Sequence, residues 1–218
     1  MKYDYIFFDL DGTLSDTFLG ITNAVVYTFG RLGEPIPDKS VIRSFIGPPL
    51  SYSFGVICGF SNEKTEIATN YFREYYEKDG WRECTLFDGM NELLRSLKEK
   101  GNKLAVATSK NEAFARPLLE MLGVYGYFDF VAASNDEVGR TSKSDVIEYA
   151  ISTLSLDDPA RVLMVGDTRF DIEGANEKGL DSVGVLFGFG TRESLEEEGA
   201  TYIAETVSDL LELLESFN

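Results

Sequence analysis

Strand-like apolar runs that alternate with helix-like segments constrain the fold of this chain more than any other feature of its sequence. The five runs are YIFFD (5–9), KLAVATS (103–109), FDFVAAS (128–134), RVLMVGD (161–167) and DSVGVLF (181–187). The segments between them carry apolar residues at helical spacing, as in GMNELLRSLKEKG, where they fall at positions 90, 93, 94 and 97. Strands that alternate with helices predict a parallel sheet, and runs that are apolar throughout predict helices on both faces. We therefore expect an α/β fold with a doubly wound, Rossmann-like parallel sheet.

Residues 15–83 interrupt this alternation, because they contain no strong strand pattern. A crossover between parallel strands needs only about a dozen residues, so this segment is far longer than a connection requires. TFLGITNAVVYTFGRLG (17–33) and EKTEIATNYFREYYEKDG (63–80) show helical periodicity, and IGPPL (46–50) indicates a loop between short helices. We predict that residues 15–83 form an inserted helical domain, and that residues 1–14 and 84–218 form the core domain. Hinges are expected near 14–17 and 80–87.

Polar side chains follow four of the five runs. They are Asp9 and Asp11 after the first, Thr108, Ser109 and Lys110 after the second, Lys143 after the third, and Asp167 and Asp171 after the fourth. In an open parallel sheet, ligands bind beyond the carboxyl ends of the strands, so these groups are expected to converge. Four carboxylates beside a hydroxyl group and a lysine predict a site for a hard cation next to a site for an anion. Mg²⁺, which binds carboxylates and phosphate oxygens, would offset the repulsion between Asp9 and Asp11.

The composition excludes several classes of function. The chain has no histidine, which removes the Ser-His-Asp and Cys-His constellations, and without a CxxC pair a zinc site of the usual kinds is not expected. The net charge of −17 disfavours nucleic acid and anionic membrane surfaces as partners. No apolar stretch approaches the ~20 residues that span a bilayer. The opening MKYDYIFF lacks the pattern of a signal peptide, so we expect a cytoplasmic protein.

The chain resembles a known superfamily in four motifs. DLDGTLSDT (9–17), AVATSK (105–110), Lys143 and VGDTRFD (165–171) are similar, in order and spacing, to the motifs of the haloacid dehalogenase phosphotransferases. RSFIGPPL (43–50) resembles the phosphoglycolate-phosphatase-like branch, and the inserted helices resemble the mobile cap of that family. The resemblance implies a Mg²⁺-dependent phosphatase that acts on a small phosphorylated metabolite.

The resemblance also implies roles for individual residues. Asp9 would be the nucleophile that forms an aspartyl-phosphate, and Asp11 the general acid and base. The metal set would comprise the side chains of Asp9 and Asp167, the backbone carbonyl of Asp11, and Asp171 in support of the water shell. Thr108 and the N–H of Ser109 would hold the phosphoryl oxygens, and Lys143 would offset negative charge.

Further residues are expected to contact the substrate, and one assignment stays open. The expected contacts are Gly12, Thr13, Ser109, Lys110 and, from the inserted domain, Arg43. Family members often have proline after the third-motif lysine, whereas this chain has Ser144. Either Lys143 or Lys110 is therefore the principal lysine on the phosphate side.

Several alternative functions are compatible with the sequence. The dehalogenases of the superfamily lack the second acid of the first motif, so dehalogenation is disfavoured, and the mutases use a cap-hinge histidine that this chain does not have. A 5'-nucleotidase or pyrophosphatase, a phosphotransferase or mutase, and a phosphate-binding regulator without turnover are the competing hypotheses. The sequence leaves open whether the protein is a monomer or a dimer.

Overall fold

The computed structural model describes residues 2–217, which form two compact units. The first unit comprises the chain up to Ser15 and from Leu86 onward, and the second comprises Asp16–Thr85. The chain leaves the first unit and returns to it beside a short two-stranded ladder, in which β2 (Ser15–Asp16) is hydrogen-bonded to β3 (Thr85–Leu86). We describe each unit by itself.

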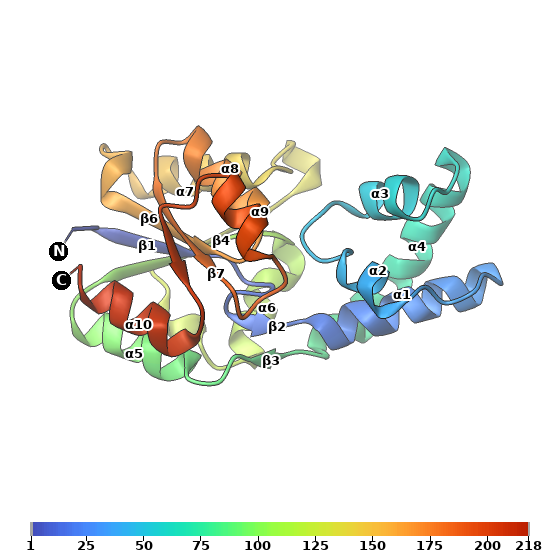
Figure 1. Ribbon diagram of the computed structural model, residues 1–218, viewed down its shortest axis with the longest axis horizontal. Coiled ribbons are helices and arrows are strands. Elements are labelled where there is room, and N and C mark those ends of the chain that lie inside the picture. Colours follow the sequence, from blue (N-terminus) through green and yellow to red (C-terminus); the bar gives the residue numbers. More distant parts are fainter. Residues whose placement is uncertain (1, 218) are drawn as a thin grey trace. The chain divides into compact units, whose positions relative to one another are not determined.

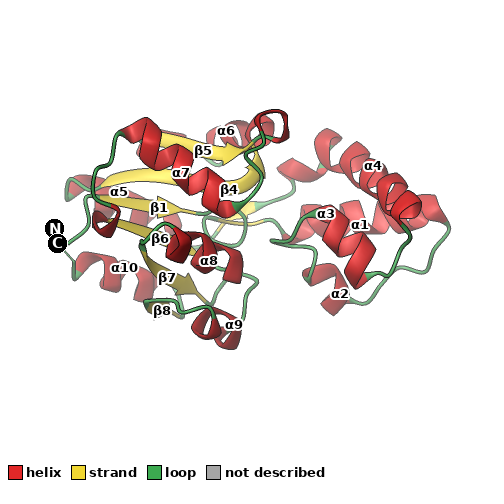
Figure 2. Cartoon of the chain, turned by 90° about the horizontal axis from the view of Figure 1, so that it is seen from above, coloured by secondary structure: helices red, strands yellow, loops and turns green. Residues whose placement is uncertain are grey.

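A six-stranded parallel sheet forms the centre of the first unit (Figures 1 and 2). Its strands are β1 (Tyr5–Phe8), β4 (Lys103–Asn111), β5 (Phe130–Ser134), β6 (Val162–Gly166), β7 (Asp181–Val185) and β8 (Tyr202–Ala204). They lie in the order β5-β4-β1-β6-β7-β8, and each neighbouring pair is parallel. After β1, the chain adds β4 and β5 on one side of β1, and then β6, β7 and β8 on its other side. The carboxyl end of β1 is therefore the topological switch point, where ligands bind in folds of this kind.

Helices cover both faces of this sheet. They are α5 (Met90–Glu99), α6 (Glu112–Met121), α7 (Lys143–Leu154), α8 (Arg169–Glu177), α9 (Arg192–Glu197) and α10 (Val207–Glu215). Figure 1 shows α5 and α10 together on one face, and α7 and α8 on the other. The expectation of a doubly wound α/β fold is confirmed.

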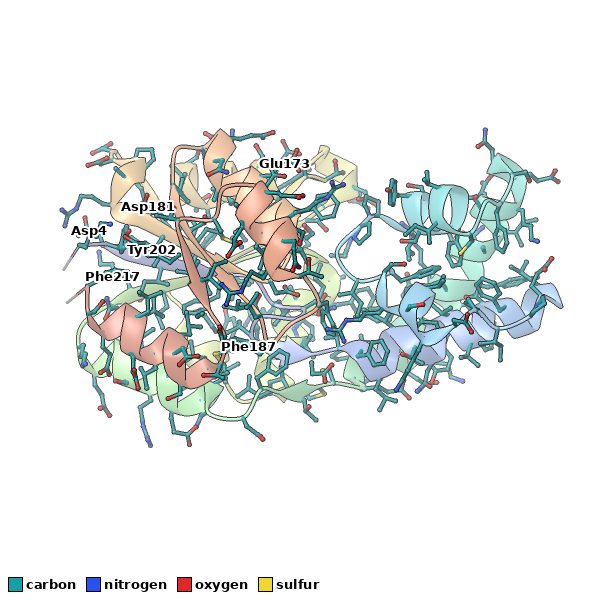
Figure 3. The ribbon with its side chains drawn as sticks, in the orientation of Figure 1. Asp4, Glu173, Asp181, Phe187, Tyr202 and Phe217 are labelled. Atoms are coloured by element: carbon teal, nitrogen blue, oxygen red, sulfur yellow. The ribbon has the colours of Figure 1, made fainter. Side chains whose placement is uncertain are left out.

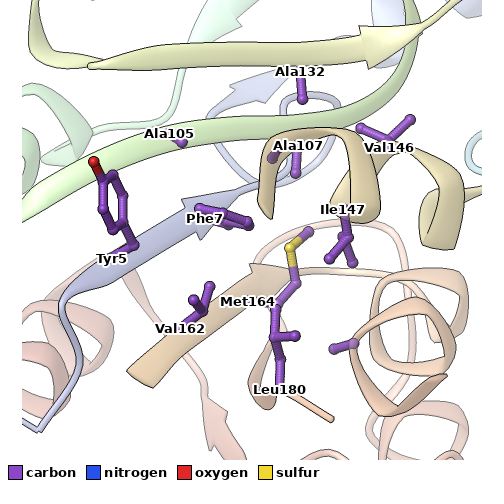
Figure 4. Close-up of a cluster of buried hydrophobic side chains, with 12 residues drawn as sticks. Tyr5, Phe7, Ala105, Ala107, Ala132, Val146, Ile147, Val162, Met164 and Leu180 are labelled. Carbon is purple, nitrogen blue, oxygen red and sulfur yellow. The ribbon is translucent and has the colours of Figure 1, made fainter. Parts of the chain in front are cut away.

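The packing beneath α7 fixes the position of β1 (Figure 4). Tyr5 and Phe7 alternate with residues of the opposite face and lie in one buried cluster with Met164 of β6. Alanines of β4 leave room for Val146 and Ile147 of α7 in the same cluster. Each large apolar side chain buried here stabilises the fold by about 1.5–3 kcal/mol. The strand that carries the first motif is therefore held rigidly along its length.

The strands differ from the predicted runs in their ends, in one irregularity and in number. The first strand ends at Phe8, so Asp9 lies just beyond it, and β4 extends to Asn111. The register between β4 and β5 shifts between Thr108 and Asn111, which indicates a bulge at the end of β4. A sixth strand, β8, was not predicted, because its three residues are too short to produce a periodic signal.

The second unit is entirely helical apart from its ladder residues. It contains α1 (Phe18–Leu32), α2 (Lys39–Arg43), α3 (Leu50–Tyr52), a π-helical turn (Ser53–Ile57), α4 (Asn62–Lys78) and a short 3-10 turn (Gly80–Arg82). Phe54 is fully buried, and its ring contacts those of Phe45 and Phe72 at centroid distances of 4.9 and 6.4 Å. Within residues 2–217, no helix is both long enough and apolar enough to cross a membrane.

Candidate active site

The first motif forms a tight loop at the carboxyl end of β1. Asp9 is buried, and its N–H donates to the carbonyl of Val165 on β6 (2.9 Å). Gly12 has a φ of 88°, and a Cβ there would lie 2.2 Å from Oδ2 of Asp167. Both the left-handed backbone and the lack of space require glycine at this position. The loop can therefore bring its backbone directly against the fourth motif.

The fourth motif places two further carboxylates beside Asp9. Asp167 follows β6 and is fully buried, and its carboxylate accepts hydrogen bonds from the N–H of Phe189 (2.8 Å) and the hydroxyl of Thr13 (3.2 Å). Asp171, in the first turn of α8, accepts from the N–H and the hydroxyl of Thr168 through Oδ2 (2.9 and 2.8 Å). One carboxylate oxygen from each of Asp9, Asp167 and Asp171 lies within 4.8 Å of the other two. We call these three residues the acidic cluster.

Lys143 is the cation of the acidic cluster. Its Nζ lies 2.7 Å from Oδ1 of Asp9 and 2.6 Å from Oδ1 of Asp171, and it donates to the carbonyl of Ala107 (3.0 Å). A Cβ at Gly174 of α8 would lie 2.8 Å from Cγ of Lys143, so the missing side chain there gives the lysine its path. Lys143 begins α7, and the buried face of that helix directs it to the end of β1.

The electrostatics of the cluster fit a bound divalent cation. Burial raises the pKa of Asp9 to about 6, against the opposing attraction of Lys143. Burial, with the charges of Asp171 and Asp9, raises the pKa of Asp167 well above its usual range. The attraction of Asp171 and Asp9 outweighs burial and raises the pKa of Lys143. Burial and mutual repulsion thus oppose the ionised forms of Asp9 and Asp167, and a divalent cation bound between the carboxylates would favour those forms and would find the oxygen ligands that such ions prefer.

Asp11 lies beside the other lysine. Nζ of Lys110 is 2.8 Å from Oδ2 of Asp11, and the lysine side chain is 4% exposed. The carboxylate of Asp11 is not part of the acidic cluster. The structure therefore divides the two lysines that the sequence left as alternatives: Lys143 neighbours Asp9, and Lys110 neighbours Asp11.

The remaining predicted residues occupy three different settings. Thr108 is buried at the end of β4, where its hydroxyl accepts from the N–H of Lys110 (3.2 Å). Ser109 is exposed, and its carbonyl accepts from the hydroxyl of Ser134 (2.8 Å). Thr13, which is predicted to contact the substrate, donates its hydroxyl to Asp167. Arg43 ends α2 in the second unit.

Sequence reasoning missed the segment 187–190, which follows β7 and donates the N–H of Phe189 to Asp167. A backbone donor has no signature in side-chain chemistry. The repeated glycines of GVLFGFG (184–190) were the only available signal, because glycine directly after a strand marks a close approach of backbone.

This fold and site define a phosphate-ester hydrolase of the haloacid dehalogenase type. Residues 6–185 match the family described as haloacid dehalogenase-like hydrolase, and the chain belongs to that family. Its relatives include phosphoglycolate phosphatases.

Individual relatives span nearly the whole chain. It is 36% identical over 216 residues to a 5'-nucleotidase of Pseudomonas aeruginosa, covering 99% of this chain and 97% of the relative. It is 35% identical over 212 residues to tyrosine-protein kinase PtkA of Mycobacterium tuberculosis, covering 96% of this chain and 72% of that protein. The crystal structure of a predicted phosphatase from Clostridium acetobutylicum has a TM-score of 0.92 and 38% identity, and the match covers 99% of this chain and 100% of that one.

Proposed function

We propose that this protein is a Mg²⁺-dependent phosphatase that hydrolyses a small phosphomonoester through an aspartyl-phosphate on Asp9. One observation carries the proposal: two carboxylates at the switch point of the sheet have different cationic neighbours. Asp9 lies against Lys143 inside the acidic cluster, whereas Asp11 lies against Lys110 outside it. Such a division suits two carboxylates that perform two different tasks, nucleophilic attack and proton transfer.

In the first half of the reaction, Asp9 attacks phosphorus. Its Oδ1 is fully enclosed and 2.7 Å from Nζ of Lys143, so we assign the attack to Oδ2. The bond between Oδ2 and phosphorus forms as the bond to the leaving oxygen breaks. Asp11 gives its proton to that oxygen, which leaves as an alcohol.

In the second half, water replaces the enzyme at phosphorus. Asp11, now ionised, takes a proton from the attacking water, and the bond between phosphorus and Asp9 breaks to release inorganic phosphate. Thr108, the N–H of Ser109 and Lys143 are proposed to hold the phosphoryl oxygens throughout, because phosphoryl transfer depends mainly on alignment and charge stabilisation. Both acids then return to their starting states.

The acidic cluster would hold Mg²⁺, together with the backbone carbonyl of Asp11. The ion would supply positive charge next to the phosphoryl oxygens as negative charge develops on them. The close grouping of three buried carboxylates supports this assignment.

The substrate is proposed to be a small phosphorylated metabolite, selected by residues 15–83 as a cap that includes Arg43. The likeness to the P. aeruginosa 5'-nucleotidase makes nucleoside 5'-monophosphates the first candidates, with phosphoglycolate and pyrophosphate next. The net charge of −17 supports a metabolite rather than nucleic acid or a membrane surface, and we propose a cytoplasmic location.

The likeness to PtkA supports a second candidate, transfer of the phosphoryl group to an acceptor hydroxyl other than water. The two functions differ only in what attacks the phosphorylated Asp9. Adding increasing concentrations of an alcohol or a tyrosine peptide during turnover separates them, because a transferase forms a phosphorylated acceptor whereas a phosphatase releases all of its phosphate to water.

The direct test is phosphate release from a panel of small phosphates by the chelator-treated protein before and after Mg²⁺ is added. Activity is expected only with Mg²⁺, and Asp9→Asn is expected to lose more than the ~10²–10⁴-fold contributed by an acid or base alone. Asp4→Asn is the matched control, because Asp4 precedes the same strand at its opposite end and pairs with Arg161 (Figure 3). Full activity in excess chelator, or in Asp9→Asn, contradicts the proposal.

A further inference from the structure

The loop after β7 holds one of the fully buried carboxylates of the acidic cluster, that of Asp167. The N–H of Phe189 donates to Oδ2 of Asp167 at 2.8 Å, while the hydroxyl of Thr13 donates to Oδ1 at 3.2 Å. Both carboxylate oxygens of Asp167 thus accept hydrogen bonds, and the donors come from two different loops. A carboxylate bound in this way has little freedom to rotate.

Two glycines bring the loop this close. A Cβ at Gly188 would lie 2.3 Å from the carbonyl oxygen of Gly12 and 2.4 Å from Cβ of Asp167. A Cβ at Gly190 would lie 1.9 Å from the carbonyl oxygen of Asp167. Neither glycine has a positive φ, so any residue could adopt its backbone conformation. What excludes a side chain at 188 and 190 is therefore the contact with Asp167 and Gly12, not the geometry of a turn.

The loop is also fastened at both ends. Leu186 donates its N–H to the carbonyl of Ala204 on β8 (2.9 Å), and the ring of Phe187 packs edge-on against Phe87 at a centroid distance of 5.1 Å (Figure 3 labels Phe187). At the other end, the hydroxyl of Thr191 accepts from the N–H of Ser194 and caps α9. Because both ends of the loop are held, the loop has little room to move away from an added side chain. We therefore expect the added side chain to displace Asp167.

We propose that residues Gly188, Phe189 and Gly190 are positioning residues that fix Asp167 in the orientation needed to bind Mg²⁺. They act on the proposed metal site through the Asp167 carboxylate. The inference rests on the proposed function, because it assumes that the acidic cluster holds a divalent ion. It adds a structural requirement that none of the four motifs contains.

The test is the affinity of the full-length protein for Mg²⁺, measured by isothermal titration calorimetry. Gly188→Ala and Gly190→Ala are each expected to weaken Mg²⁺ binding by about 10–100-fold, the usual cost of disturbing groups that orient metal ligands. Gly126→Ala is the matched control, since this glycine also lacks a positive φ and a Cβ there would meet nothing within 4 Å. Its Mg²⁺ affinity is expected to equal that of the wild type.

Circular dichroism separates a displaced carboxylate from a lost fold. If either alanine variant fails to fold, Phe187→Leu serves instead, because it loosens the attachment to Phe87 without adding atoms near Asp167, and it should weaken Mg²⁺ binding in the same direction. The loop inference alone is overturned if the wild type both binds Mg²⁺ and hydrolyses phosphate esters, and the folded variants bind Mg²⁺ with an affinity within twofold of the wild type. A wild type that hydrolyses phosphate esters without binding Mg²⁺ overturns the metal assignment together with it.

Discussion

Replacing Lys143 with methionine should destabilise the core unit strongly, because it removes the ammonium group that pairs with two buried carboxylates of the acidic cluster. The side chain of Lys143 is 4% exposed, and those of its partners Asp9 and Asp171 are 10% and 0% exposed. Breaking a buried ion pair at one partner costs about 3–5 kcal/mol, since the charge left behind has neither water nor a counter-ion. At about 2–4 °C per kcal/mol for a chain of this size, the melting temperature should fall by roughly 6–20 °C.

A lysine on the same pair of helices provides the control. Lys178 lies 3.2 Å from Glu148 of α7 in a pair that solvent reaches, with 26% and 55% of the side chains exposed. Lys178→Met should cost less than about 1 kcal/mol, as exposed pairs do. Thermal unfolding and urea unfolding would be followed for both variants in the presence of a chelator, and Mg²⁺ should restore part of the loss in Lys143→Met. Equal stabilities for the two variants would refute the view that Lys143 compensates buried charge.

Three further outcomes follow from the site and the fold. Asp11→Asn should slow hydrolysis most for alkyl phosphates and least for an aryl phosphate with an acidic phenol, whose leaving group needs no proton; equal losses for both would argue that Asp11 is structural. Asp145→Ala should cost about 0.5–2 kcal/mol at pH 7, because hydrogen bonds from Ser142 lower the pKa of this capping carboxylate in the folded protein. The difference from wild type should begin to shrink as the pH falls below the unfolded pKa of about 3.9, and it should be lost only below the lower pKa of the folded state, where Asp145 takes up its proton. A cost that stays the same at pH 3 would contradict this assignment. Replacing residues 15–83 with a Gly/Ser linker should keep hydrolysis of an aryl phosphate and abolish discrimination among natural phosphates; full discrimination without the insert would place selectivity in the core unit.

The sequence was sufficient where chemistry follows directly from a strand. Asp9 and Asp167 each come immediately after a long apolar run, and parallel strands bring their carboxyl ends to one edge of a sheet, so the meeting of these two acids was predictable. The same reasoning predicted five of the six strands of the core sheet. It missed β8, whose three residues owe their extended conformation to pairing with β7.

The sequence was insufficient where a side chain had several partners within reach. In the sequence, Lys110 and Lys143 each come after a strand-like run. The packing of α7 against α8, with Gly174 at the contact, directs Lys143 to the acidic cluster. The hydrogen bond from the Thr13 hydroxyl to Asp167 also joins two motifs that lie far apart in the sequence, and no local pattern indicated it. Such choices depend on distances between elements, which local sequence patterns do not encode.

Asp171 divides its two oxygens between tasks of different kinds. Oδ2 begins α8 by accepting from Thr168, whereas Oδ1 lies against Lys143. Selection for the start of a helix and selection for turnover therefore act on the same carboxylate. A descendant of this chain without Asp9, the proposed nucleophile, would still need Asp171 to begin α8. The VGDTRFD segment should therefore be retained even where catalytic activity has been lost. Relatives that keep the fourth motif but not Asp9 are expected to be folded proteins that no longer turn over a phosphate ester.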